Sequence, residues 1–284
     1  MTLTMAWIRN VGSREELVFA TDSRLSGGSD WDCCPKIMLL PRKDCLIAFA
    51  GDTKDAYPLM IQLRNWIEVN TNVRDTSYDI NDLKKRIRTI FNDMRLFIGD
   101  LPGSQEKPDP PDCQLIFGGW SWKSKSFKIW RFHYSKQSDA FDFDRVGIGY
   151  KVGWHHPIVF AGTKAAVELA RDRIINLLKQ RGRFKTSYFD MEPFEVLRDI
   201  IRENLFDDIG GPPQLAKIYQ NGSTQVFAVR WKMPHGRDIT VLGRPLFPNA
   251  KNPLRTIDPD QINFVPEKTI RKKILRAQKR AQQA

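Results

Sequence analysis

Three residues near the start of the chain have types and spacing that could form a hydrolase site. Thr2 would carry both a hydroxyl nucleophile and a free α-amine if the initiator methionine were removed. A free α-amine titrates near about 7.7 to 8.0, so it can accept the proton of its own hydroxyl at neutral pH. A lysine cation held by an aspartate would lower the pKa of that amine further, and Lys36 and Asp22 are the candidates. The pattern predicts a threonine nucleophile that works only at a freed N-terminus.

Gly51 is the fourth candidate residue. It ends an apolar stretch and lies just before a predicted helix. A glycine there is either a plain turn residue or a point where a substrate backbone approaches an exposed N–H. Because the positive end of the helix dipole would face a developing oxyanion, we favour the second interpretation.

Four short stretches in this region together resemble the proteasome β-subunit and bacterial HslV-type family of N-terminal-nucleophile hydrolases. They are Met1 to Arg9, Phe19 to Arg24, Pro35 to Met38 and Phe49 to Thr53. The resemblance covers roughly residues 2 to 230 and is most specific in about the first 70. It implies that Thr2 is the nucleophile, that Asp22 and Lys36 support it, and that the backbone N–H of Gly51 donates to the oxyanion.

The resemblance also implies a substrate pocket and an acidic support, and it reveals two departures. By position, Leu25, Phe49 and Thr53 would line the pocket beside the scissile bond, which favours apolar side chains. Where the family has Ser-Gly before its third helix, this chain has Ala161-Gly162. Where the family has an Asp, two further residues and then Ser-Gly-Gly, the chain reads Phe206-Asp207-Asp208-Ile209-Gly210-Gly211. The serine is absent and the acid is displaced by one place, so Asp207 and Asp208 are the candidate acids.

The order of predicted elements indicates an α+β fold. Strands are predicted over 2–9, 16–21, 36–40, 45–50, 113–117, 127–134, 140–146, 157–162, 215–219 and 224–231, and helices over 55–69, 79–97, 163–180 and 193–205. Asp79 is the expected N-cap of the second helix, whose apolar face would run to Phe97. Alternation of strands with helix pairs fits two stacked antiparallel sheets, each covered by two helices. This is the four-layer αββα sandwich that the resemblance implies.

Composition limits the function classes. The 284 residues are 41% hydrophobic and 27% charged, and no apolar run reaches the about 18 residues of a membrane helix. The first residues lack the features of a signal peptide, so we expect a cytoplasmic protein. The cysteines (Cys33, Cys34, Cys45 and Cys113) and the four histidines show no metal-ligand spacing, so we expect no metal and no cofactor.

The chain changes character after residue 244. We predict a hydrolase domain over 1–244 and a proline-rich segment with a basic helix over 245–284. The last 18 residues hold seven Lys or Arg against Glu267, which is half of the net charge of +12. This tail is interpreted as a docking helix, a solvated helix end or, less favoured, a nucleic-acid contact. The aromatic residues of 127–134 beside Lys123, Lys125 and Lys128 could stack on bases, but a half-buried sheet is the preferred interpretation.

The leading functional hypothesis is a threonine endopeptidase that cleaves peptides or unfolded proteins. The resemblance further implies a homo-oligomeric ring with the nucleophiles facing an inner chamber, supplied by a separate AAA+ ATPase. The chain itself contains no P-loop motif, which would read GxxxxGK followed by Ser or Thr. Two alternatives stay open: a catalytically weakened structural or regulatory ring subunit, suggested by the missing serines, and a nucleic-acid-binding protein that acts through its basic tail.

Overall fold

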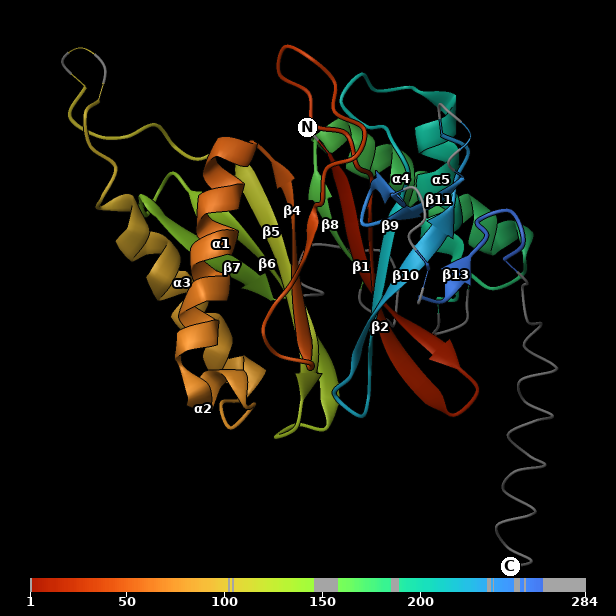
Figure 1. Cartoon of the computed structure of the whole chain (residues 1–284), viewed down its shortest axis with the longest axis horizontal. Helices are drawn as coiled ribbons and strands as arrows, with labels where there is room; N and C mark the ends of the chain where they lie inside the picture. The colour runs from red at the N-terminus through yellow and green to blue at the C-terminus, as the bar shows by residue number, and fades with distance from the viewer. Residues whose placement is uncertain are drawn as a thin grey trace, which may run out of the picture.

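The protein is an α+β fold with two antiparallel β-sheets and helices that cover their outer faces (Figure 1). The computed structural model describes residues 2–101, 103, 105–145, 158–184, 189–233, 236, 238–247, 251–252 and 254–262. The basic stretch 267–284, and with it the predicted docking helix, lies outside the described residues.

Within the described residues the first sheet contains eight strands; Thr2 directly precedes the first strand of the chain and Asp22 directly follows the second. The order across it is β12, β11, β10, β9, β2, β1 and β8, with β13 paired to β10. These strands are β1 (Leu3–Val11), β2 (Arg14–Thr21), β8 (Ile158–Gly162), β9 (Gln214–Tyr219), β10 (Thr224–Arg230), β11 (Ile239–Val241), β12 (Arg244–Pro245) and β13 (Thr256–Ile257). All pairings are antiparallel except the short one between β10 and β13.

The second sheet contains five strands in the order β3, β4, β5, β6 and β7. They are β3 (Ile37–Leu39), β4 (Cys45–Gly51), β5 (Cys113–Ser121), β6 (Ser126–Ser135) and β7 (Ala140–Arg145). Three aromatic residues of β6, Phe127, Trp130 and Phe132, are buried in the core, and Tyr134 is half-buried. They are therefore packed side chains of the sheet and are not exposed for stacking on bases.

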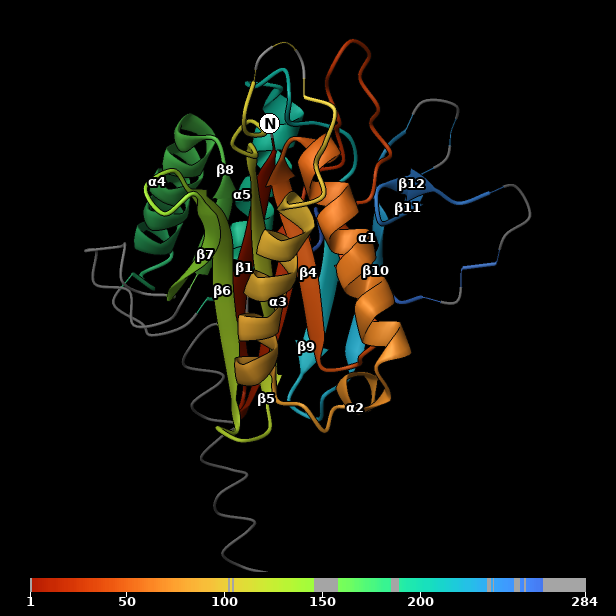
Figure 2. The same cartoon turned by 90° about the vertical axis from the view of Figure 1, so that its left-hand side faces the viewer.

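Helices cover the outer face of each sheet, and Figure 2 looks onto the pair that covers the five-stranded sheet. The five-stranded sheet packs against α1 (Thr53–Val69) and α3 (Ile80–Arg95), with the short α2 (Thr71–Arg74) between them in the chain. The eight-stranded sheet packs against α4 (Lys164–Gln180) and α5 (Glu192–Glu203). A third apolar cluster, which includes Ala6, Phe19, Ala48 and Ile116, lies between the two sheets.

The alternation of side chains along β1 decides where Thr2 points. Leu3, Met5 and Trp7 pack in the cluster under α4 and α5, whereas Ala6 and Ile8 face the other sheet. Successive side chains of a strand point to opposite faces, so Thr2 and Thr4 share the side of Ala6 and Ile8. The alternation of side chains along β1 therefore places the candidate nucleophile at one end of the space between the sheets.

Most predicted elements are present, with shifted ends. The helix predicted from residue 55 begins at Thr53, because the Asp52 carboxylate caps it by accepting the Lys54 N–H at 2.9 Å. Asp79 is the N-cap of α3, as predicted, and it accepts the Asn81 N–H at 2.9 Å.

The predicted ends of two helices are wrong. Phe97 was expected on the inner face of its helix, but α3 ends at Arg95 and Phe97 is 88% exposed. Leu205 lies beyond the end of α5 and is 51% exposed, because Asn204 adopts a left-handed conformation (φ 48°) that ends the helix. In both cases the apolar spacing of the sequence continued past the point where the backbone leaves the helix.

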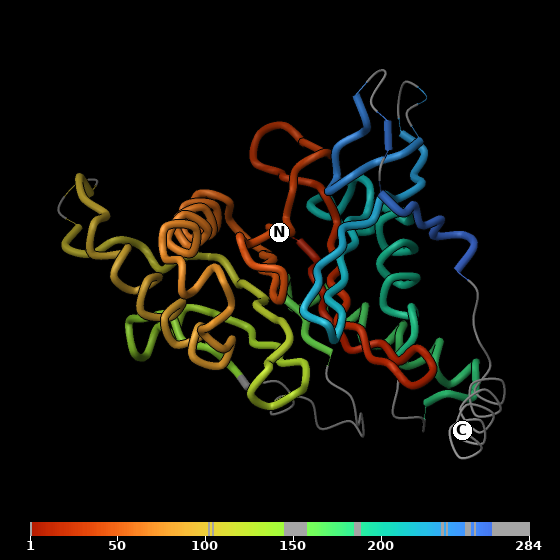
Figure 3. The backbone as a smooth tube through the Cα atoms, turned by 60° about the horizontal axis from the view of Figure 1, so that its bottom comes forward, coloured from red at the N-terminus to blue at the C-terminus, as the bar shows by residue number. Residues whose placement is uncertain are grey.

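The described parts of the chain after residue 244 run beside the main body, as the tube in Figure 3 shows. The predicted boundary at 244/245 falls within β12, and β13 pairs with β10. Arg202 of α5 forms a two-point ion pair with Asp260, with N–O distances of 2.6 and 2.8 Å.

Candidate active site

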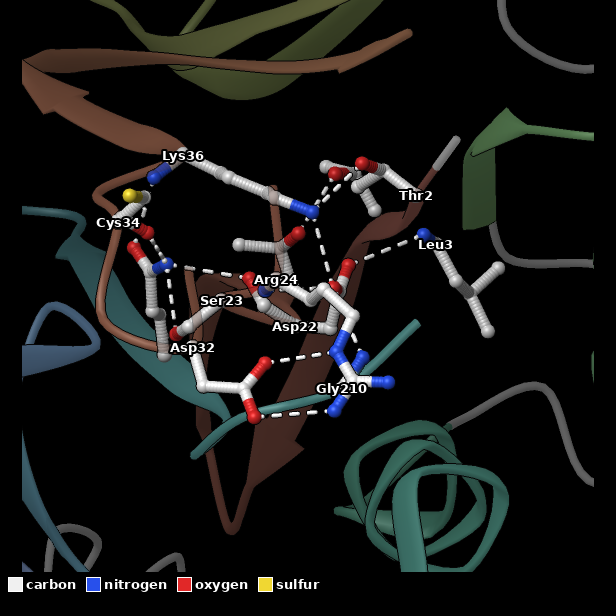
Figure 4. Close-up of polar contacts among 12 residues, drawn as sticks. Thr2, Leu3, Asp22, Ser23, Arg24, Asp32, Cys34, Lys36 and Gly210 are labelled. Carbon is white, nitrogen blue, oxygen red and sulfur yellow. Dashed lines mark hydrogen bonds and ion pairs between the residues drawn. The ribbon is translucent and has the colours of Figure 1, made fainter. Parts of the chain in front are cut away.

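Thr2, Lys36 and Asp22 lie together at the end of the inter-sheet space (Figure 4). The Lys36 Nζ donates to the Thr2 Oγ1 at 2.6 Å and to the Asp22 Oδ2 at 2.9 Å. All three residues are buried: Thr2 is 1% exposed and the other two are fully covered. Residues that are 34 and 14 positions apart in the chain thus meet in one hydrogen-bonded group.

The Asp22 carboxylate is held in one orientation by the backbone. It accepts the Leu3 N–H at 3.2 Å on Oδ1, and the N–H groups of Arg24 and Gly210 at 3.0 and 3.3 Å on Oδ2. The last of these comes from the turn before β9, about 190 residues along the chain. Because a carboxylate can accept up to about four such bonds, Asp22 has little freedom to turn away from Lys36.

The environment of Lys36 changes its proton affinity. Burial lowers the pKa of the Lys36 ammonium below its ordinary value of 10.5, while the charge and hydrogen bond of Asp22 oppose that shift. The charge of Asp208 also opposes the lowering of the Lys36 pKa. The Lys36 Nζ lies 2.6 Å from the Thr2 hydroxyl oxygen, so a charge on the ammonium would favour loss of the hydroxyl proton.

The two candidate acids of the turn before β9 have different surroundings. The charge of Asp208 acts on Lys36, whereas Asp207 supplies its backbone carbonyl to Arg24 at 3.1 Å. Of the pair, Asp208 is the one that the fold brings into the electrostatic range of the lysine. Nothing in the sequence distinguished one acid from the other.

Gly51 sits at the junction of β4 and α1 in a conformation that favours glycine. Its φ is +106°, and a Cβ there would lie 2.2 Å from the Asp112 carbonyl oxygen. The strand end is tied to β1 because the Thr4 Oγ1 donates to the Phe49 carbonyl at 2.7 Å, two residues from both Thr2 and Gly51. A side chain at position 51 would therefore strain the backbone beside the nucleophile.

Gly162 contacts the candidate nucleophile from the other side. Its φ is +148°, it pairs with Leu3 across β1 and β8, and a Cβ on it would lie 2.2 Å from the Thr2 carbonyl oxygen. The neighbouring Ala161 and, in the turn before β9, Ile209 are fully buried in the apolar core. These are the two positions where the resemblance implied a serine, so neither supplies a hydroxyl.

The three predicted pocket residues have different surroundings. Phe49 is fully buried, and its ring packs on Tyr57 in the core under α1. Leu25 is half-buried and forms an isolated β-bridge with Trp31, a residue that is 64% exposed. Thr53 is the half-buried first residue of α1. Phe49 thus shapes the site through its backbone, while Leu25 and Thr53 are partly accessible.

Sequence reasoning missed Gln214 and the Arg24–Asp32 pair. Gln214 is fully buried at the start of β9 and hydrogen-bonds to the segments that carry Asp22 and Lys36. Arg24 forms a two-point contact with Asp32 at 2.7 and 2.9 Å, which closes the base of the loop between Asp22 and Lys36. The available signal for Gln214 was a polar residue that opens a strand whose other residues, except Lys217, are apolar or aromatic.

No family model matches this chain, and no curated protein matches it. Among the described residues, no three His, Cys, Asp or Glu side chains are grouped so that they could hold a metal ion. Within the same part of the chain, none of the helices combines the length and apolar character needed to cross a membrane.

Proposed function

We propose that the protein is a threonine peptidase of the N-terminal-nucleophile class, with Thr2 as the nucleophile after removal of Met1. The observation that carries the proposal is the buried contact of the Lys36 Nζ with the Thr2 Oγ1 at 2.6 Å and with Asp22 at 2.9 Å. A structural ion pair requires Lys36 and Asp22 but does not require a hydroxyl at hydrogen-bond distance from the lysine. A nucleophile that must lose a proton requires all three.

In the proposed mechanism the Thr2 Oγ attacks the carbonyl carbon of a peptide bond while its proton passes to the freed α-amine of the same residue. Lys36, held by Asp22, favours the alkoxide-like oxygen by its charge. The Gly51 N–H donates to the oxygen of the tetrahedral intermediate. When the intermediate collapses, the C–N bond breaks and the amine returns the proton to the leaving nitrogen. A water molecule, which gives a proton to the same amine, then attacks the acyl-enzyme ester. The bond between the acyl carbon and the Thr2 oxygen breaks, the carboxylic acid product leaves, and the amine returns the proton to the Thr2 oxygen.

We further propose that the fold is the four-layer αββα sandwich of this class. The three apolar clusters support it, since one lies between the sheets and one lies under each helix pair. Assembly into a homo-oligomeric ring, cooperation with a separate AAA+ ATPase and a cytoplasmic location belong to the same proposal, because the resemblance of the first 70 or so residues implies them.

One observation favours a second candidate, a ring subunit with weakened or lost turnover. Ala161 and Ile209 occupy the places where the class has serines, and both are buried among apolar side chains. A hydroxyl that would orient the freed amine is therefore missing at each place. This alternative keeps the scaffold and the Lys36–Asp22 pair but predicts slow or absent acylation of Thr2.

The test is covalent labelling of Thr2. The protein is produced with an N-terminal extension in place of Met1, and cleavage of this extension leaves Thr2 as the first residue. The intact mass is measured before and after reaction with a β-lactone, which acylates hydroxyl nucleophiles. We expect one adduct per chain, located at Thr2 by peptide mass spectrometry, and hydrolysis of a fluorogenic peptide.

Matched variants make this test specific. Thr2→Ala should abolish the adduct, Thr2→Ser should keep it, and Thr89→Ala, which changes an exposed threonine of α3, should react like the wild type. Retaining the extension should also prevent the reaction. A wild-type chain that starts at Thr2 and neither reacts nor cleaves the peptide would favour the inactive subunit, and unchanged cleavage by Thr2→Ala would overturn the proposed mechanism.

A further inference from the structure

Gln214 joins the two segments that carry the candidate ion pair. It is fully buried at the first position of β9, where it pairs with Thr21 of β2. Its side-chain oxygen accepts the Lys36 N–H at 3.0 Å and the Ile37 N–H at 3.3 Å. Its side-chain nitrogen donates to the carbonyl of Asp22 at 3.1 Å and to that of Cys34 at 2.8 Å.

The two ends of this amide therefore have separate partners. The nitrogen holds the strand end at Asp22 and also contacts the Ser23 Oγ at 3.0 Å, while the oxygen holds the backbone of Lys36. Ser23 in turn donates to the Pro212 carbonyl, two residues before Gln214, at 2.5 Å. Only a side chain that both donates and accepts can satisfy these buried backbone groups.

The segment between Asp22 and Lys36 needs hydrogen bonds that fix its two ends relative to each other. Residues 26–30 of it are exposed, and the contact that matters, from the Lys36 Nζ to the Thr2 Oγ1, depends on where the Lys36 backbone lies relative to Asp22. Functional side chains must be held within about 0.5 Å of their productive geometry. A backbone bond from the Cys34 N–H to the Ser23 carbonyl at 3.1 Å joins the same two segments but does not hold the N–H of Lys36 itself.

We propose that Gln214 is a positioning residue for the reaction: its amide sets the distance between the backbones of Asp22 and Lys36 and thereby aims the lysine ammonium at the Thr2 hydroxyl. The inference rests on the proposed function. Gln214 does not touch the reacting oxygen, so its effect is on the rate at which Thr2 is acylated and not on the affinity for substrate.

The test compares Gln214→Glu with the matched variant Gln225→Glu. Gln225 lies on the neighbouring strand β10, where it is half-buried and accepts the Tyr219 hydroxyl at 3.2 Å, a bond that a glutamate keeps. The carboxylate introduced by Gln214→Glu would still accept the two N–H groups, but when ionised it could not donate to the carbonyls of Asp22 and Cys34. We expect β-lactone acylation of Thr2 to slow by about tenfold or more, and peptide hydrolysis to lose kcat with KM unchanged.

Two readouts separate positioning from loss of structure. A positioning role slows acylation while every folded chain still reaches one adduct, whereas partial unfolding lowers the final number of adducts and leaves the rate of the remainder unchanged. The deficit of Gln214→Glu relative to the wild type should also shrink toward acid pH, because a protonated glutamic acid can donate to one of the two carbonyls. Gln225→Glu should acylate at the wild-type rate.

Gln214→Asn is the second variant, because it keeps the amide without adding a charge and is one methylene too short to reach both segments. It should also slow acylation at full stoichiometry. Acylation within about twofold of the wild type in both variants, reduced stoichiometry at unchanged rate, or failure of both variants to fold would overturn the positioning role. Failure of the proposed function would appear in the wild type itself, as absence of the Thr2 adduct.

Discussion

The Lys36–Asp22 ion pair provides the sharpest test of how the site is built. Replacing Asp22 by Asn removes the carboxylate bonded to the Lys36 Nζ in a place where both side chains are fully buried. Breaking a buried pair at one end costs about 3 to 5 kcal/mol, because the remaining charge is left without compensation. The introduced asparagine also has one acceptor atom fewer than the aspartate. Its NH2 group must face either the Leu3 N–H or the N–H groups of Arg24 and Gly210, and it cannot accept a hydrogen bond from them. We therefore expect Asp22→Asn to lose about 3 to 5 kcal/mol of unfolding free energy.

The double variant shows whether this cost comes from the stranded charge. Lys36→Met removes the cation and leaves Asp22 with its three backbone N–H donors, so it should cost less than Asp22→Asn. Combining both changes removes the uncompensated charge, and the double variant should be more stable than Asp22→Asn alone. The assay is urea unfolding with a two-state check, read beside the acylation rate of Thr2. The double variant should recover stability without recovering acylation.

Two results would refute this reasoning. Costs that add within about 0.5 kcal/mol would show that Asp22 and Lys36 do not act as a pair. A cost of Asp22→Asn below about 1 kcal/mol would show that water or another carboxylate, such as Asp208, compensates the lysine.

The pH dependence of stability follows from the same burial. The pKa of Lys36 is lowered in the folded protein, so between that value and its ordinary 10.5 the unfolded chain binds more protons than the folded one. In this window the free energy of unfolding of the wild type should rise with pH relative to Lys36→Met, because the cost of burying the cation disappears as it loses its proton. A difference between the two that stays constant up to about pH 10 would contradict the lowered pKa.

Two further predictions concern the surroundings of the site. Gly51→Ala should lose at least about 1 to 3 kcal/mol of unfolding free energy and slow acylation of Thr2, since its φ is +106°. Gly99→Ala, at an open position, should stay within about 0.5 kcal/mol, and equal effects of the two changes in urea unfolding would reject a special role for Gly51. Brief alkylation of the native protein near neutral pH should modify Cys33, which is exposed, before the buried cysteines, because burial raises the pKa of Cys113 to about 12. Peptide mass spectrometry would detect the opposite order, and alkylation in denaturant is the control for intrinsic reactivity.

Local patterns in the sequence predicted most of the elements. Alternating side chains predict strand β1 and its hairpin partner β2, and both are present. The position of Asp79 just before an apolar helical stripe predicts that it caps α3, and it does. These predictions hold because a cap or an alternating strand depends on neighbours within a few residues. The ends of helices were predicted less well, because apolar spacing alone does not show where Arg95 or Asn204 lets the backbone leave the helix.

The sequence by itself determined which residue types were available for chemistry: a threonine behind the initiator methionine, an aspartate after the second strand and a lysine after the next loop. Tertiary structure alone decided that the lysine lies 2.6 Å from the threonine hydroxyl and that Gln214, 178 residues beyond Lys36, joins its backbone to that of Asp22. The physical reason is that such contacts are made between strands, and their geometry is set by the stacking of two sheets whose partners are far apart in the chain.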